Sequence, residues 1–253
     1  MLFYAPQSET HFLSLRLTLF ALNNLLRRNP MNRLQTFLLN LKSSNGHLDS
    51  ASELEHLNAQ IEANPNSANA YFQRGVFFGK GNIESIERYG HYQEEHSTQA
   101  LNDYRKAIEL DPHFIKAYFH QASLLFALDM DDSTAEDIIE QALSIAPNNV
   151  ECLLLYADIV SCDGVNPHAV EILDRVIATA PCAKHFFYKA RALMDCGEMD
   201  WFLDNIIQGT TYLKAAISIF EQIFLMDDND ECLDETIEHL EQCYFLLDSH
   251  VYH

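Results

Sequence analysis

The chain has 253 residues, with 37 acidic and 16 Lys and Arg side chains, and its formal net charge is −21 at neutral pH. Binding to nucleic acid needs clustered Lys and Arg that displace counterions, so this charge argues against a nucleic-acid partner and against an anionic membrane surface. Hydrophobic residues make up 48% of the chain and Gly (8) and Pro (7) are sparse, which favours a folded helical protein.

Residues 1–30 differ from the rest, because they carry three arginines and a single acid in an otherwise acidic chain. The Leu-rich stretch 12–26 is interrupted by Arg16 and is shorter than the ~20 residues that span a bilayer, so we expect no stable membrane insertion. Its basic residues do not precede it as they would in a signal peptide. Three interpretations stay open: an extra helix packed on the following repeats, a targeting segment, or sequence upstream of a start at Met31.

The prolines reveal an internal repeat, with separations of 35, 47, 35 and 34 residues between Pro30, Pro65, Pro112, Pro147 and Pro181. Twelve residues before three of them stands a small residue, namely Ala100, Ala135 and Ala169. Eight residues before stand Tyr104, Ile139 and Leu173, and five residues before stand Ala107, Ala142 and Val176. Spacings of four and three place these positions on one face of a helix that ends at the proline.

A second helix is predicted after each proline. Six residues on come large side chains, Tyr71, Tyr118, Leu153 and Phe187. Ten residues on come Gly75, Ala122 and Ala157, and then Arg191 in the last unit. A small residue at this second position lets a partner helix approach closely.

These positions resemble the tetratricopeptide repeat, a helix-turn-helix unit of roughly 34 residues. The resemblance covers Asn66 to Pro181, and its best stretch is ALNDYRKAIELDP, Ala100 to Pro112. It implies an all-α fold, an α-solenoid of antiparallel helix pairs in a right-handed superhelix. We expect an N-terminal extension or extra helix in 1–30, about five units in 31–230 with the first and last degenerate, and a C-terminal capping helix in 231–253.

Two repeats each span 47 residues, 13 more than the standard 34, with the surplus within Lys80–His96 and Gly197–Tyr212. Such insertions either lengthen a helix pair or build loops on one face of the solenoid. In the first surplus region Gly79 and Gly81 are expected to end a helix, because no Ser or Thr follows Lys80 as a phosphate-binding loop would require.

The last predicted helix covers residues 231–247 and carries an apolar stripe at helical spacing, consisting of Leu233, Ile237, Leu240, Tyr244 and Leu247. An open solenoid end would leave an apolar face in water, and arrays therefore close with an atypical helix that is polar on its outer side. We expect this helix to cap the stack.

No motif for catalysis, for a cofactor or for a metal is found. His91 and His96 are five residues apart, whereas the zinc-binding H-E-x-x-H motif places its histidines four apart. There is no G-x-S-x-G elbow, and no Cys lies beside a His in a nucleophile signature. The six cysteines form no C-x-x-C pair, so we expect them to be reduced and the protein to be cytoplasmic. The sequence therefore predicts a protein that is not an enzyme.

The resemblance also implies a concave groove lined by the first helix of each pair. Offsets of seven and eleven after each proline, with one further position, give Phe72, Val76, Phe119, Ser123, Phe126, Leu154, Asp158, Tyr188 and Ala192. Related domains that clamp a peptide carboxylate place Lys and Asn there, so we do not expect such a clamp. The groove is aromatic and apolar, which favours a protein or peptide partner, such as an amphipathic helix with basic flanks.

The function expected from this pattern is that of a non-catalytic scaffold or adaptor that binds a peptide or helix in the groove. The alternatives are a chaperone that holds one client, as secretion-type chaperones with this repeat do, and a recognition subunit of an enzyme.

Overall fold

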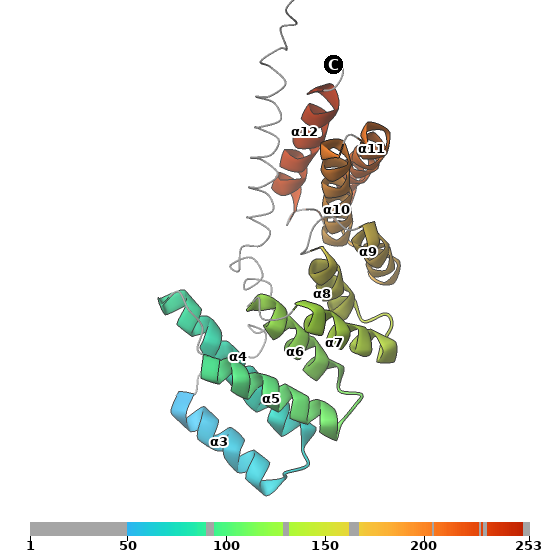
Figure 1. Ribbon diagram of the computed structural model, residues 1–253. Helices are drawn as coiled ribbons and strands as arrows, with labels where there is room; N and C mark the ends of the chain where they lie inside the picture. The colour runs from blue at the N-terminus through green and yellow to red at the C-terminus, as the bar shows by residue number, and fades with distance from the viewer. Residues whose placement is uncertain are drawn as a thin grey trace, which may run out of the picture. The chain divides into compact units, whose positions relative to one another are not determined.

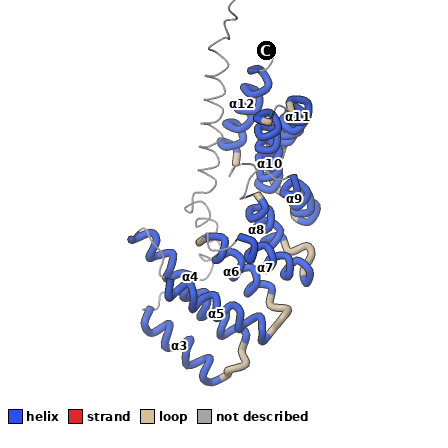
Figure 2. The backbone as a smooth tube through the Cα atoms, viewed as in Figure 1, coloured by secondary structure: helices blue, strands red, loops and turns tan. Residues whose placement is uncertain are grey.

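The computed structural model describes residues 50–89, 94–128, 132–161, 167–203, 205–227, 229 and 232–249. Within these ranges the chain forms ten α-helices and no strand, which confirms the predicted all-α class (Figures 1 and 2). The helices belong to two compact units, α3 to α8 and α9 to α12, called here the N-terminal unit and the C-terminal unit. The predictions for residues 1–30 and for the repeat up to residue 49 lie outside the described residues.

The N-terminal unit consists of six helices that pack in chain order: α3 (Ser50–Ala63), α4 (Ala68–Tyr89), α5 (Glu94–Leu110), α6 (Ile115–Ala127), α7 (Asp132–Ile145) and α8 (Val150–Val160). The predicted prolines Pro65, Pro112 and Pro147 all lie in the short turns between helices. Proline stops the preceding helix, because its ring clashes with the turn before it, and it suits the entry to the next helix. The predicted helix-pair repeat is confirmed here.

Polar side chains fix where the next helix begins. Ser67 Oγ accepts a hydrogen bond from the backbone N–H of Ala70 at 3.2 Å, and Asn149 Oδ1 accepts one from the N–H of Cys152 at 2.9 Å. Such bonds satisfy backbone donors that have no partner within the first turn of a helix. The turn that follows the second helix of each pair is compact and has about four residues.

The small and apolar positions predicted for the second helices form their buried face. On α5, Ala100, Tyr104 and Ala107 are all fully buried, and the equivalent positions on α7 and α9 are buried as well. The predicted close approach between the helices of a pair is also present. A Cβ atom on Gly75 would lie only 2.7 Å from Cε1 of Tyr104, so α4 approaches α5 at a distance that only glycine allows.

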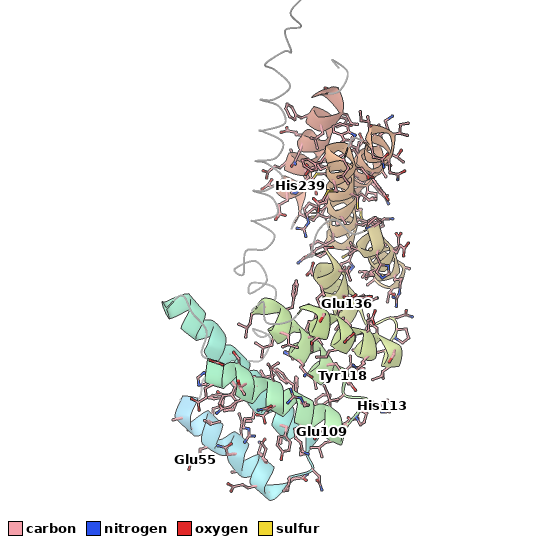
Figure 3. The ribbon with its side chains drawn as sticks, viewed as in Figure 1. Glu55, Glu109, His113, Tyr118, Glu136 and His239 are labelled. Atoms are coloured by element: carbon pink, nitrogen blue, oxygen red, sulfur yellow. The ribbon has the colours of Figure 1, made fainter. Side chains whose placement is uncertain are left out.

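The C-terminal unit consists of α9 (Pro167–Thr179), α10 (Ala183–Phe202), α11 (Ile206–Ile223) and α12 (Leu233–Ser249). Its core includes Phe187, Leu213 and Phe220, and α12 packs on it through the imidazole of His239, whose ring lies 5.4 Å from that of Phe187 (Figure 3). Arg191, which stands where the repeat has a small residue, is exposed. In the α10–α11 pair the close contact between helices is instead at Gly197 and Gly209.

Both surplus segments lengthen a helix pair. Helices α4 and α5 have 22 and 17 residues and α10 and α11 have 20 and 18, whereas α6 to α9 have 11 to 14. The prediction that Gly79 and Gly81 end a helix is wrong, because α4 continues through both to Tyr89. A glycine inside a helix costs about 1 kcal/mol, and the packing of α4 along α5 outweighs that cost.

Candidate functional site

The predicted groove residues of α4 are part of the core of the N-terminal unit. Phe72 is 6% exposed and Val76 is 7% exposed. The ring of Phe72 lies 5.0 Å from that of Phe114 and 5.1 Å from the imidazole of His120, which come from the following helix pair. In this structure these two side chains hold the repeats together and offer almost no surface to a ligand.

The groove positions of α6 are buried too, whereas those of α8 keep some surface. Phe119, Ser123 and Phe126 are each less than a tenth exposed. Leu154 is partly exposed and Asp158 is exposed. In the N-terminal unit, accessible groove surface among the nine predicted residues is therefore confined to α8.

Two predicted groove residues lie in the C-terminal unit, on α10. Tyr188 and Ala192 are both partly exposed, and the guanidinium of Arg191 lies 5.8 Å from the centre of the Tyr188 ring. Seven of the nine residues thus belong to the N-terminal unit and two to the C-terminal unit. The groove as a binding site stays a prediction.

Large exposed apolar side chains lie mainly in the C-terminal unit. Of the nine large hydrophobic residues that are exposed among those the structure describes, only Ile145 belongs to the N-terminal unit. The other eight are Leu203, Ile206 and Ile207 at the α10–α11 turn, Phe224 and Leu225 after α11, and Ile237, Tyr244 and Phe245 on α12. Ile207 and Leu225 lie at opposite ends of α11, so the eight residues are spread over the unit, and only Ile237 and Tyr244 on α12 share one helix face.

On α12 the exposed residues follow the stripe that the sequence singled out, defined here as the α12 stripe: Leu233, Ile237, Leu240, Tyr244 and Leu247. The fully buried residues of α12 lie beside this stripe; they are Thr236 and Cys243, which are both 0% exposed. Ile237 and Tyr244 remain 43% and 44% exposed, whereas Leu240 and Leu247 pack against the core. The stripe therefore lies at the edge of the packed face, and two of its five residues are exposed to solvent.

Acidic side chains border the open edge of the α12 stripe. Asp234, Glu241 and Asp248 recur every seven residues, each one position after a leucine of the stripe, and all three are exposed. On the side of α11, the hydroxyl of Tyr244 donates a hydrogen bond to Oε1 of Glu221 at 2.8 Å. Helix α12 itself carries five acidic residues and no Lys or Arg. The surface thus combines an apolar stripe with negative charge along its border.

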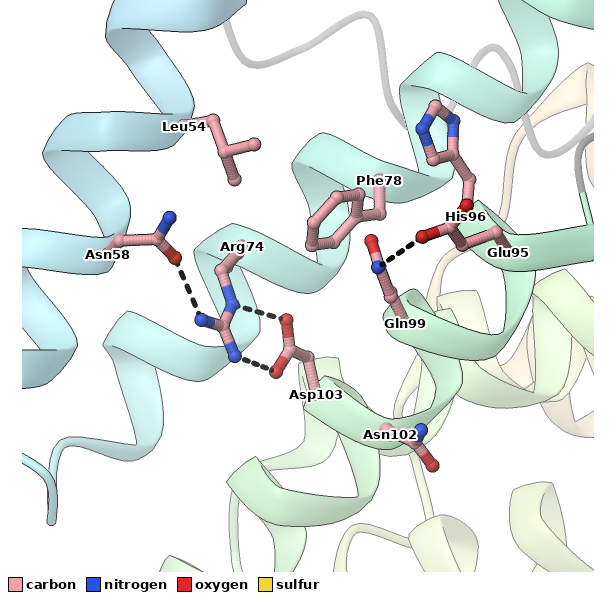
Figure 4. A pocket seen from close by; sticks show the side chains of 9 residues that line it. All are labelled: Leu54, Asn58, Arg74, Phe78, Glu95, His96, Gln99, Asn102 and Asp103. Carbon is pink, nitrogen blue, oxygen red and sulfur yellow. Dashed lines mark hydrogen bonds and ion pairs between the residues drawn. The ribbon is translucent and has the colours of Figure 1, made fainter.

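A cavity of about 590 Å³ lies between α3, α4 and α5 of the N-terminal unit (Figure 4). On its wall the Nε and Nη2 atoms of Arg74 donate to the two carboxylate oxygens of Asp103, each at 2.8 Å, and Nη1 donates to Asn58 Oδ1 at 2.9 Å. The hydrogen bond to Asp103 raises the pKa of Arg74. This network joins all three helices, since Asn58 is on α3, Arg74 on α4 and Asp103 on α5.

The described residues provide little for catalysis. No three His, Cys, Asp or Glu side chains among them are grouped so that they could hold a metal ion, and His91 lies outside them. Five cysteines of the described part are free thiols, and burial raises the pKa of both Cys152 and Cys243 to about 12. Thiols with such pKa values are poor nucleophiles at neutral pH. No helix in the described part is long and apolar enough to cross a bilayer.

No protein-family model matches the chain, and no curated protein matches it in sequence. Solved structures with a similar fold include MamA, with 16% identity and a TM-score of 0.48 over 69% of this chain and 84% of that chain. YrrB, described as a TPR protein with an unusual peptide-binding site, has 18% identity and a TM-score of 0.43 over 67% of this chain and 79% of that chain. Yeast Tom70 has 16% identity and a TM-score of 0.42 over 85% of this chain and 47% of that chain.

Proposed function

We propose that this chain is a non-catalytic scaffold that binds another protein, and that the α12 stripe receives an amphipathic helix with basic residues beside its apolar face. The observation that supports the proposal is the partly exposed apolar stripe with its row of acids. The stripe has spacings of four, three, four and three residues, which is the heptad pattern of helices that pair side by side.

The geometry of a heptad explains the expected partner. In paired helices the residues next to the apolar seam face charged residues of the other helix and determine which partner is accepted. Here that row consists of Asp234, Glu241 and Asp248, so a partner with Lys or Arg in the facing row is favoured and one with Glu is repelled. Burial of exposed surface on Ile237 and Tyr244 adds the apolar contribution, at about 25 cal/mol per Å².

The predicted concave groove is the competing surface for the same function. Its partly exposed residue Tyr188 lies on α10, so the two surfaces can be separated by single substitutions. Binding that is lost in Tyr188→Ala and retained in Ile237→Ala would assign the partner to the groove.

The test uses two synthetic helical peptides with the same leucine heptads, one flanked by Lys and the other by Glu, and measures binding to the full chain by fluorescence anisotropy. The Lys-flanked peptide is expected to bind and the Glu-flanked peptide to bind much more weakly. Ile237→Ala combined with Tyr244→Ala should weaken binding by about tenfold or more, because both contacts of the seam are lost.

Charge substitutions on α12 provide the matched control. Glu241→Lys is expected to weaken binding of the Lys-flanked peptide and to strengthen binding of the Glu-flanked peptide. Glu235→Lys makes the same charge change at an exposed position of the same helix that faces away from the stripe, and it should leave the preference nearly unchanged. Equal affinity for the two peptides, or equal effects of these two substitutions, would contradict the proposal.

A further inference from the structure

The cavity between α3, α4 and α5 is large enough for a ligand, since binding pockets usually measure about 300–1,000 Å³, and it belongs to the N-terminal unit, whereas the α12 stripe belongs to the C-terminal unit. The cationic side chain in its lining, Arg74, does not favour binding of an anion. The guanidinium of Arg74 is paired in two-pronged fashion with Asp103, which is only 5% exposed, and its third contact goes to Asn58. The positive charge on this wall is therefore already neutralised.

The remaining polar groups of the cavity offer acceptors. Glu95 is exposed, and its Oε1 accepts a hydrogen bond from Gln99 Nε2 at 3.4 Å, which leaves the other carboxylate oxygen and the amide oxygen of Gln99 available (Figure 4). His96 also lines the cavity. A carboxylate is an acceptor only, so these oxygens favour a ligand that brings N–H donors.

An aromatic side chain completes the cavity. Phe78 is 9% exposed, and its ring centre lies 5.7 Å from that of His96. Phe78 therefore forms an apolar part of the lining and offers little ring surface for stacking. A guanidinium brings a positive charge and five N–H donors for the acceptors of the cavity, whereas an ammonium is compact and more strongly hydrated.

We propose that this cavity binds the guanidinium group of an arginine side chain supplied by a partner polypeptide. Glu95 and the amide oxygen of Gln99, on the α5 side of the cavity, accept its hydrogen bonds. The Arg74–Asp103 pair holds the wall in place without competing for the ligand, because both of its charges are satisfied within the protein. The site is independent of the α12 stripe, and either proposal can fail without the other.

The test titrates the full chain, with ¹³C-labelled leucine methyl groups, with N-acetyl-arginine-N-methylamide, and follows the NMR signals of Leu54 in the cavity wall. The matched probe is the citrulline analogue, which has the same shape and no charge. We expect a saturable shift with the arginine probe and about tenfold weaker binding of the citrulline probe, because charge-assisted hydrogen bonds are lost. Equal binding of both probes, or no shift with either, would overturn the proposal.

Substitutions localise the site. Glu95→Gln, at an exposed position where folding is not at risk, should weaken the arginine probe by about tenfold. Glu109→Gln removes the same charge from the same helix at an acid that pairs with Lys106, and it should have no effect. An unchanged affinity in Glu95→Gln would overturn the proposal. Tighter binding of free L-arginine than of the capped residue would also overturn it, since the site would then serve an amino acid.

Discussion

The hydroxyl of Tyr104 is fully buried on α5 and has no hydrogen-bond partner among the residues that the structure describes. Leaving a hydroxyl without a partner costs free energy that removal of the oxygen recovers, so Tyr104→Phe should raise the free energy of unfolding by about 1 kcal/mol. Tyr156→Phe is the control, because the Tyr156 hydroxyl donates to Glu140 Oε1 at 2.7 Å, and its loss should destabilise the protein. Urea unfolding measures both changes, and a destabilised Tyr104→Phe would refute the expectation.

The imidazole of His120 packs against the rings of Phe72 and Tyr104, and its burial lowers its pKa to about 4, with a smaller effect of Lys116. In the unfolded chain this pKa is about 6.5, so the unfolded state takes up a proton first as the pH falls. Stability present above pH ~6.5 is therefore lost progressively down to pH ~4, by up to about 3 kcal/mol.

His120→Phe retains the ring contacts and removes the titrating group. The free energy of unfolding of this variant, measured in urea between pH 7.5 and pH 4.5, should fall less steeply than that of the natural chain. His113→Gln, at an exposed turn, is the control and should follow the natural chain (Figure 3). A variant that loses as much stability as the natural chain would show that His120 does not cause the acid sensitivity.

At the scale of helices, the long pair α10–α11 depends on the contact between Gly197 and Gly209. A Cβ atom on Gly209 would meet the Trp201 ring and would lie 2.8 Å from the carbonyl oxygen of Gly197, which is backbone and cannot rotate away. Gly209→Ala should therefore separate the helices and lower stability by about 1–3 kcal/mol. Gln208→Ala, an exposed neighbour, should be nearly neutral in the same thermal unfolding assay, and similar melting temperatures for the two variants would refute this reasoning.

The order of the helices could be predicted from the sequence because proline and the small residues act locally. Pro112 lies in the turn between α5 and α6 because its ring cannot continue the helix before it, and small residues such as Ala100 and Ala107 let two helices approach closely. The face that α12 turns to the core could not be predicted in this way. Ile237 is more hydrophobic than Thr236, yet Thr236 is buried, because the small side chains of Thr236 and Cys243 fit against the core of the unit.

At the scale of the whole molecule, offsets from the prolines do not predict which of the groove residues are buried. The resemblance places Phe72 and Val76 at groove positions, but burial depends on side chains far along the chain, such as Phe114 and His120, whose proximity no spacing rule reveals. The network of Arg74, Asp103 and Asn58 was missed for the same reason. Its sequence signal is weak, because Arg74 and Asp103 are 29 residues apart and acids are abundant throughout the chain.

The acidic border of the α12 stripe also affects self-association of the protein. Two identical stripes that met in antiparallel fashion would bring Asp234, Glu241 and Asp248 of one copy against the same row of the other, and like charges at such a seam repel. An exposed apolar stripe would otherwise promote dimers. We therefore expect the acidic border to oppose self-association of the protein through this stripe.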